Sequence, residues 1–274
     1  MTIKYLDHFN FSTKPFSKEL GDAELWIPPT KKALIDDLCE AIADHDSVLL
    51  TGEPGVGKTC VLRAVRARIP AQGCRLTYCH NATLGRRDFY RQLCHALGLA
   101  PSATAAALFY AVSTHVQDLG RDHMHPVFLL DEAHLLHQDT LDHLHILLNY
   151  EWDSRALLSL VLVGLPELED RLALRRNRSL FQRIHRRFRV DPLTIDDTHD
   201  YLRVRLRRAG NEKELFASDA IGLLHEATRG SLREVDRIAT WSLREAARLA
   251  KKRVERDIIC RAVDTTSTFE EGTT

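Results

Sequence analysis

The sequence lacks the features of a membrane or secreted protein. It contains no uncharged apolar stretch of about 18 residues, the length that a transmembrane helix requires. The first eight residues have no apolar core of the kind found in signal peptides. None of the 6 cysteines forms a C-x-x-C pair, so free thiols in a reducing compartment are expected. These absences predict a cytoplasmic protein without a membrane partner.

The chain also lacks a net charge, with 38 basic and 38 acidic residues among 274. Overall charge therefore gives no argument for or against a nucleic-acid partner. The distribution is more informative, because the stretch 171–208 contains 12 arginines and only 4 acidic residues. Such a local excess attracts polyanions. A subunit interface or solvated helix faces would use arginines in the same way, so both interpretations stay open.

The most specific motif is a glycine-rich loop that matches the phosphate-binding pattern G-x-x-x-x-G-K-[ST]. It stands between an apolar run at 47–51, which predicts a buried strand, and helical spacing at 58–68. Glycines allow backbone N–H groups to face phosphates, and the next helix adds positive potential. We expect Lys58 on the β- and γ-phosphates of ATP and the Thr59 hydroxyl on Mg²⁺. The expected nucleotide-binding residues are Gly52, Glu53, Pro54, Gly55, Val56, Gly57, Lys58, Thr59 and Cys60.

A second motif places two acidic residues after an apolar run. Residues 127–130 are Val, Phe, Leu and Leu, and Asp131 and Glu132 follow. Such a strand delivers carboxylates to the edge of an α/β sheet where ligands bind. We expect Asp131 to hold Mg²⁺ through water and Glu132 to polarise the attacking water. An acidic helix N-terminus is the alternative for this motif alone, but its pairing with the phosphate loop favours ATP hydrolysis.

Strand-like and helix-like segments alternate between residues 33 and 192, which predicts an α/β domain with a parallel sheet sandwiched by helices. Only helical patterns follow, so 193–265 should form a small α-helical domain. Residues 1–32 are expected to form an irregular arm whose aromatic side chains pack on the body or on a neighbour. The tail at 266–274 is rich in threonine and acidic residues, and disorder is expected there. The predicted strands are 47–51, 75–79, 127–131 and 158–163, with a short one near 188–190.

Together these residues resemble the AAA+ P-loop ATPases, in the branch shared by secretion-pathway A-type ATPases and transposition helper ATPases. The segments 5–11 (YLDHFNF) and 14–17 (KPFS) are similar to the N-terminal signature of that branch, and the resemblance covers about residues 4–263. It implies ATP bound between subunits and a helical lid after the α/β domain. It also implies that Arg233, in the run GSLR, is a sensor 2 arginine on the lid. An ordinary helix start with Ser231 as its cap is the alternative.

The resemblance points to three further elements. Arg183 is the expected arginine finger, which acts in the neighbouring subunit's site, and its rivals are Arg178, Arg186 and Arg187. Leu165 stands where relatives usually have a polar sensor 1 side chain, which argues against fast hydrolysis but leaves nucleotide binding unaffected. In DNA-loading relatives the segment after the second strand contacts the DNA backbone, so Thr83, Arg86 and Arg87 are expected to bind phosphates. A capped helix N-terminus is the alternative for that segment.

Two further sequence features are interpreted as having no functional role. Asp131–His134 spells a helicase-box tetrapeptide (DEAH), but no companion helicase motifs accompany it. Four nearby histidines are read as surface residues rather than zinc ligands; they are His134, His137, His143 and His145.

The leading functional hypothesis is an ATP-dependent DNA-binding helper ATPase. It would oligomerise on duplex DNA, without sequence specificity, as a ring or helical filament and deliver that DNA to a transposase. The alternative is a secretion- or pilus-assembly A-type ATPase. Those proteins usually continue into a membrane span and a cell-wall-binding domain, and this sequence ends soon after the lid, which favours transposition. A third hypothesis, a scaffold that never hydrolyses ATP, is disfavoured by the intact Lys58, Asp131 and Glu132.

Overall fold

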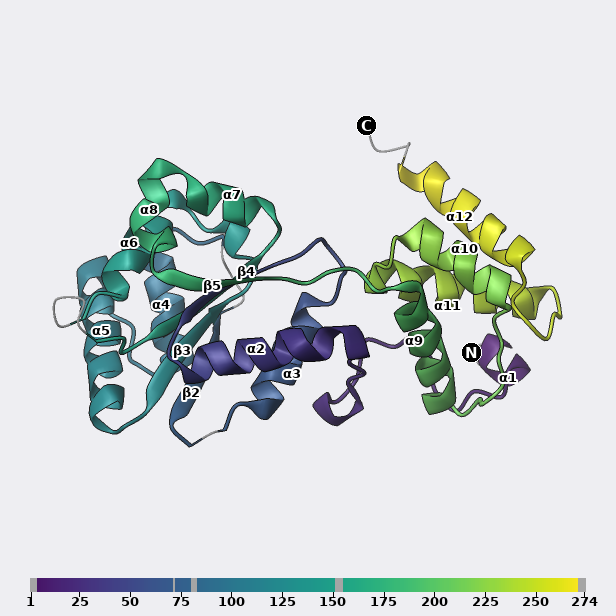
Figure 1. The fold of residues 1–274 in the computed structure, drawn as a ribbon, viewed down its shortest axis with the longest axis horizontal. Helices are drawn as coiled ribbons and strands as arrows, with labels where there is room; N and C mark the ends of the chain where they lie inside the picture. The colour runs from purple at the N-terminus through teal and green to yellow at the C-terminus, as the bar shows by residue number, and fades with distance from the viewer. Residues whose placement is uncertain (1–3, 71, 80–82, 151–154, 271–274) are drawn as a thin grey trace. The chain divides into compact units, whose positions relative to one another are not determined.

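The computed structural model describes residues 4–70, 72–79, 83–150 and 155–270. The chain divides into two compact units, and each is described by itself (Figure 1). The sheet unit comprises Ala33–Glu53 and Val61–Val190. The lid unit comprises Met1–Lys32, Pro54–Cys60 and Asp191–Thr274. The phosphate loop therefore begins in the sheet unit and continues in the lid unit.

A parallel sheet of five strands forms the centre of the sheet unit, in the order β2-β3-β4-β1-β5. The strands are β1 (Ser47–Thr51), β2 (Cys74–Cys79), β3 (His125–Leu130), β4 (Ser159–Gly164) and β5 (Ile184–Arg189). This confirms the predicted α/β fold with a parallel sheet. The largest difference in strand boundaries concerns β5, which begins four residues before the predicted short strand. Its start was not predicted because buried and exposed residues alternate along it and arginines interrupt the apolar pattern.

Helices flank this sheet, with α2 and α3 together on one side and α4 to α8 on the other (Figure 1). Their bounds are α2 (Lys32–Ala43), α3 (Lys58–Arg68), α4 (Arg86–Leu97), α5 (Ala105–Arg121), α6 (Gln138–Leu147), α7 (Glu167–Ala173) and α8 (Arg178–Phe181). Two 3-10 turns, η3 (Ala133–Leu135) and η5 (Arg175–Asn177), lie among them. The layers match the sequence pattern, in which buried strands alternate with amphipathic helices.

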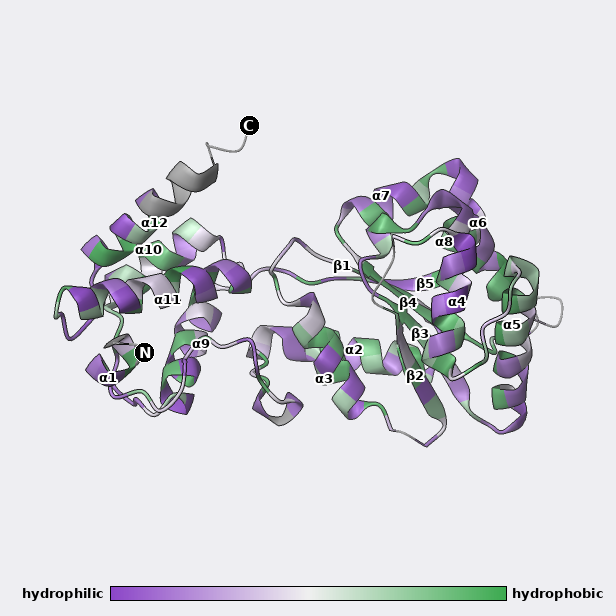
Figure 2. Cartoon of the chain, turned by 180° about the vertical axis from the view of Figure 1, so that it is seen from behind, coloured by the Kyte–Doolittle hydropathy of each residue, from purple (hydrophilic) through white to green (hydrophobic). Residues whose placement is uncertain are grey.

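The central strands β1, β3 and β4 are apolar because both of their faces are buried. Leu49 is paired with Leu162, and Leu162 with Leu130, so the three form one row across the sheet. This row belongs to the core shared with α4, α5 and α6. Neighbouring residues such as Val161 point to the opposite face and are also buried. Figure 2 shows the corresponding apolar colouring of the central strands, with hydrophilic residues on the surrounding helices.

The lid unit is helical, as the pattern after residue 193 predicts. Its helices are α1 (Lys4–His8), α9 (Ile195–Arg208), α10 (Ser218–Thr228), α11 (Leu232–Arg248) and α12 (Arg256–Glu270), with 3-10 turns η1 (Asp22–Glu24) and η2 (Pro29–Lys31). Helix α12 extends beyond the predicted domain end at 265, into the expected disordered tail, because extending an existing helix needs no new nucleus. Residues 271–274 lie outside the described residues.

The N-terminal arm packs on the lid helices. Tyr5, Phe9, Phe11 and Phe16 share one buried core with α9, α10, α11 and α12. Buried Arg205 of α9 fixes the arm further, because its guanidinium donates to the carbonyl oxygens of Pro15 (2.7 Å) and Ser17 (2.5 Å). The expectation of an irregular arm was therefore wrong at 4–8, which form α1 and contact α11.

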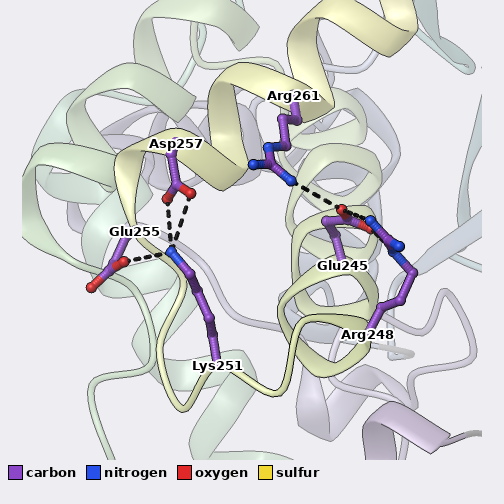
Figure 3. A network of polar contacts seen from close by, with 6 residues as sticks. All are labelled: Glu245, Arg248, Lys251, Glu255, Asp257 and Arg261. Carbon is purple, nitrogen blue, oxygen red and sulfur yellow. Dashed lines mark hydrogen bonds and ion pairs between the residues drawn. The ribbon is translucent and has the colours of Figure 1, made fainter.

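Charged side chains connect the end of α11 to the start of α12 (Figure 3). Lys251 Nζ lies 2.8 Å from Glu255 Oε2 and 3.1 Å from Asp257 Oδ2. Glu245 pairs with Arg248 at 2.6 Å and with Arg261 at 3.7 Å.

Within the part of the chain that the structure describes, no helix has the length and apolar character needed to cross a membrane.

Candidate nucleotide-binding site

The phosphate loop leaves the sheet unit at the carboxyl end of β1. Thr51, the last residue of that strand, is paired with Gly164 at the end of β4. The Gly52 N–H donates to the Gly164 carbonyl oxygen at 3.2 Å, which fixes the first residue of the motif. This is the edge of a parallel sheet where nucleotides bind.

In the lid unit, two glycines give the rest of the loop its shape. Gly55 and Gly57 have φ angles of +80° and +99°, a region that other residues rarely adopt. Lys58 begins helix α3, so the loop ends at a helix N-terminus that presents backbone N–H groups to an anion. Lys58 is buried, at 9 % exposure, whereas Thr59 is exposed.

The start of α11 packs against this loop within the lid unit. The Arg233 N–H donates to the Gly55 carbonyl oxygen at 3.3 Å. A Cβ atom added to Gly55 would lie 2.6 Å from Ser231 Oγ and 2.9 Å from Arg233 Cβ, so glycine is required sterically as well. Ser231 occupies the N-cap position but makes no side-chain capping bond, which weakens the alternative of an ordinary capped helix. Arg233 thus lies beside the phosphate loop, and its role as a sensor 2 arginine stays a prediction.

Asp131 follows β3 directly, at the same edge of the sheet. Its N–H donates to the Cys79 carbonyl oxygen at 3.1 Å, and the residue is only 8 % exposed. Its carboxylate accepts hydrogen bonds from the Tyr78 hydroxyl and from the Glu132 N–H, both at 2.9 Å. These donors hold the carboxylate in one orientation.

Sequence reasoning missed Tyr78. It is the second-last residue of β2, and its partner in register is Leu129 rather than Asp131, so no sequence spacing indicates the contact. Partial burial, and then the Asp131 carboxylate that it faces, raise the pKa of the Tyr78 phenol. The phenol therefore remains protonated at neutral pH and acts as a donor.

Glu132 has a left-handed backbone, with φ 53° and ψ 35°. Non-glycine residues adopt this region at a cost of about 1–3 kcal/mol, and such residues concentrate at functional sites. The side chain is 51 % exposed, so it is accessible to a water molecule. His134 Nε2 lies 3.6 Å from Glu132 Oε2.

The residue types fit ATP and Mg²⁺. The loop supplies backbone N–H groups and the Lys58 ammonium, which match phosphate oxygens. Thr59 and Asp131 supply hydroxyl and carboxylate oxygens, the ligands that Mg²⁺ prefers. Bound Mg²⁺ would neutralise charge on the phosphates, and Asp131 would hold the ion through water.

The finger candidates differ in their surroundings. Arg183 is partly buried and donates to the Ser179 carbonyl oxygen at 3.1 Å. Arg186 is held by Asp46 and two further acids, and Arg187 stacks on Phe181 at 3.7 Å. Arg178 is exposed on α8, and its side chain makes no polar contact within the described structure. Arg183 and Arg178 therefore remain the better candidates.

The three predicted DNA-binding residues have different surroundings. Arg86 is directed to α6, where its guanidinium contacts His143 Nε2 at 2.9 Å, whereas Arg87 is exposed at the start of α4. The Thr83 carbonyl oxygen lies 2.9 Å from His137 Nε2. Asn81 and Ala82, in the same predicted segment, lie outside the described residues.

The four histidines interpreted above as surface residues differ in their exposure. Within the described residues, no group of three His, Cys, Asp or Glu side chains is placed to hold a metal ion. The reading of His134 as a surface residue was wrong, because its side chain is only 16 % exposed. It is partly buried because the turn η3 contacts the end of β4, which a helical interpretation of the sequence does not show.

Residues 41–172 match the AAA domain family, a range that contains the phosphate loop, Asp131 and Glu132. The chain contains an AAA domain. It is 32 % identical over 279 residues to the general secretion pathway protein A of Aeromonas hydrophila. That alignment covers 98 % of this chain and 50 % of the relative, so this chain spans about half the length of the curated protein. The branch predicted from the N-terminal signature is confirmed by this similarity.

Solved structures show the same AAA+ fold. The ORC1 protein of Aeropyrum pernix, solved in complex with DNA, has a TM-score of 0.67 and 20 % identity, with 93 % of this chain and 70 % of that one covered. Cdc6p from Pyrobaculum aerophilum has a TM-score of 0.66 and 18 % identity, with 88 % and 67 % covered. At these identities the similarity concerns the fold alone.

Proposed function

We propose that this AAA+ ATPase hydrolyses Mg²⁺-bound ATP with the residues of its two motifs. The observation that carries the proposal is the shared sheet edge, from which Gly52 begins the phosphate loop and at which Asp131 and Glu132 follow β3. Lys58→Ala should abolish ATP binding, measured with a fluorescent ATP analogue, because an uncompensated triphosphate is costly to hold. Lys252→Ala, at an exposed lysine of the lid unit, is the matched control. Wild-type affinity in Lys58→Ala would overturn this assignment of the loop.

Glu132 is proposed to orient and polarise the attacking water. Glu132→Gln preserves the shape of the side chain but removes the carboxylate, so ATP binding should persist while turnover stops. Steady-state phosphate release with a parallel binding titration tests both parts. Turnover at the wild-type rate in Glu132→Gln would exclude this role.

The arginine finger is proposed to act between subunits. Arg183 precedes β5, at the amino edge of the sheet, whereas Asp131 is at the carboxyl edge. A strand of this length separates the two edges by about 20 Å. Arg183 is therefore far from Asp131 and Glu132 of its own chain, as a residue acting on a neighbour must be.

A mixing experiment tests this arrangement. Arg183→Ala should be inactive alone and partly active with added Lys58→Ala, which still donates its own Arg183. Arg178→Ala is the parallel variant, since Arg178 is the exposed rival. Full activity of Arg183→Ala together with inactivity of Arg178→Ala would move the finger to Arg178.

For the biological role, we propose ATP-dependent assembly, as a ring or filament, on duplex DNA and delivery of that DNA to a transposase. Exposed Arg87 supports a backbone contact, and one fold relative was solved in complex with DNA. Binding should be independent of sequence, and each neutralised phosphate should contribute about 0.9 to the slope of log affinity against log salt. Arg87→Ala should flatten that slope in fluorescence anisotropy with an ATP analogue. Arg91→Ala is the control, because Arg91 lies on the same helix but pairs with Asp88 at 3.1 Å.

A secretion- or pilus-assembly role is the second candidate, and the 32 % identity to the general secretion pathway protein A favours it. Electron micrographs with duplex DNA and a slowly hydrolysed ATP analogue distinguish the two roles. Assemblies that form only with DNA support the transposition role. The absence of ATP-dependent DNA binding at every salt concentration would favour the secretion role.

A further inference from the structure

His134 contacts the end of β4, the segment that the resemblance identifies with the sensor 1 element. That element ends at Leu165, whose own side chain is apolar and forms no hydrogen bonds. The Leu165 N–H, however, donates to His134 Nδ1 at 3.5 Å. The imidazole of His134, in the turn η3, is thus hydrogen-bonded to the backbone at the end of β4.

The surroundings hold this ring in place. A Cβ atom added to Gly164 would lie 3.2 Å from both the backbone nitrogen and Nδ1 of His134, so the ring packs where only a glycine leaves room. Arg171 Nη1 of α7 donates to the His134 carbonyl oxygen at 2.9 Å, which fixes the backbone as well. The imidazole is therefore positioned by both β4 and α7.

The hydrogen bond to Nδ1 determines what the other ring nitrogen does. Because Nδ1 accepts from the Leu165 N–H, the neutral ring carries its proton on Nε2. Nε2 lies 3.6 Å from Glu132 Oε2. The ring thus directs an N–H group toward the carboxylate that is proposed to polarise water.

We propose that His134 is the positioning residue for Glu132, and that it replaces the missing sensor 1 side chain by linking the end of β4 to that carboxylate. Glu132 is half exposed and would otherwise adopt several rotamers. An N–H group on one side restricts it to the orientation that faces a water molecule. The proposal rests on the ATP hydrolysis proposed above and assigns a role to the last residue of the DEAH tetrapeptide.

Two substitutions separate this role from simple packing. Asn places its amide oxygen near the position of Nδ1, so His134→Asn keeps the bond to Leu165 but no longer reaches Glu132. Gln places its amide nitrogen near the position of Nε2, so His134→Gln keeps an N–H group directed at Glu132. A packing role predicts that both variants behave alike, or that the shorter Asn, which keeps the backbone bond, performs better.

The experiment measures kcat, KM and ATP affinity for the full chain and both variants, with thermal unfolding to verify folding. His134→Asn should lower kcat by about 10- to 100-fold, as loss of an orienting partner does, with ATP affinity and KM unchanged. His134→Gln should recover most of that loss. Equal kcat in wild type and His134→Asn, or a lower kcat in His134→Gln than in His134→Asn, would overturn the proposal. An inactive wild type would instead refute the proposed hydrolysis itself.

Discussion

Acid should destabilise the sheet unit through one buried histidine, His125 at the start of β3. Its Nε2 lies 2.8 Å from Ser159 Oγ, and its ring stacks on His45 with centroids 3.7 Å apart. The residue is 7 % exposed. Burial, and to a lesser extent the His45 ring, lower the pKa of His125 from 6.5 to about 4. The folded protein therefore favours the neutral imidazole.

The sign and size of the effect follow from this shift. Between pH 6.5 and about 4 the unfolded chain binds a proton at this site that the folded chain does not, so stability falls as the pH falls. The full shift corresponds to roughly 3 kcal/mol, reached below the folded pKa. Between about pH 7.5 and pH 5 the expected loss is about 2 kcal/mol.

Urea unfolding followed by circular dichroism at these two pH values measures the loss. His125→Gln keeps a polar group near Ser159 but does not titrate, so its stability should fall by about 2 kcal/mol less than that of the wild type. His95→Gln, at an exposed histidine of α4, should follow the wild type. An equal fall in stability between the two pH values in wild type and His125→Gln would refute the reasoning. This comparison holds even where the substitution itself lowers the stability at neutral pH.

Three other predictions follow from particular contacts. Gly230→Ala should destabilise the lid unit by more than about 2 kcal/mol in thermal unfolding, because φ is +70° and the new Cβ would overlap the backbone of Leu193. Gly222→Ala, which has open space on α10, should be neutral or stabilising. Equal effects of the two substitutions would contradict this prediction. Lys251→Met should lower the unfolding temperature slightly, and the difference should vanish in high salt because the ion pairs of Figure 3 are exposed. Tyr78→Phe removes a donor that orients the Asp131 carboxylate, so half-maximal ATPase activity should need about three- to tenfold more Mg²⁺. An unchanged or lower Mg²⁺ requirement would show that the phenol does not orient the carboxylate for the ion.

Local patterns in the sequence were sufficient for the elements that carry the two motifs. The apolar run before Gly52 forms β1 with the predicted bounds, and α3 begins at Lys58 as expected. Residues adjacent in sequence cannot be far apart, so a strand followed by a glycine loop and a helix determines its own geometry. The same reasoning placed Asp131 and Glu132 directly after β3, because a buried strand must end where the acidic residues begin.

Contacts between residues distant in sequence were decided only by the tertiary structure. The strand order β2-β3-β4-β1-β5 places Tyr78 beside Asp131, 53 positions away, and the fold of η3 onto β4 places His134 against Leu165, 31 positions away. Neither pair has a spacing that the periodicity of a helix or strand connects. The sequence by itself therefore determined the chemical groups of the proposed site. Only the packing of the chain decided which side chains orient them, because hydrogen bonds at a sheet edge join residues from separate strands and turns.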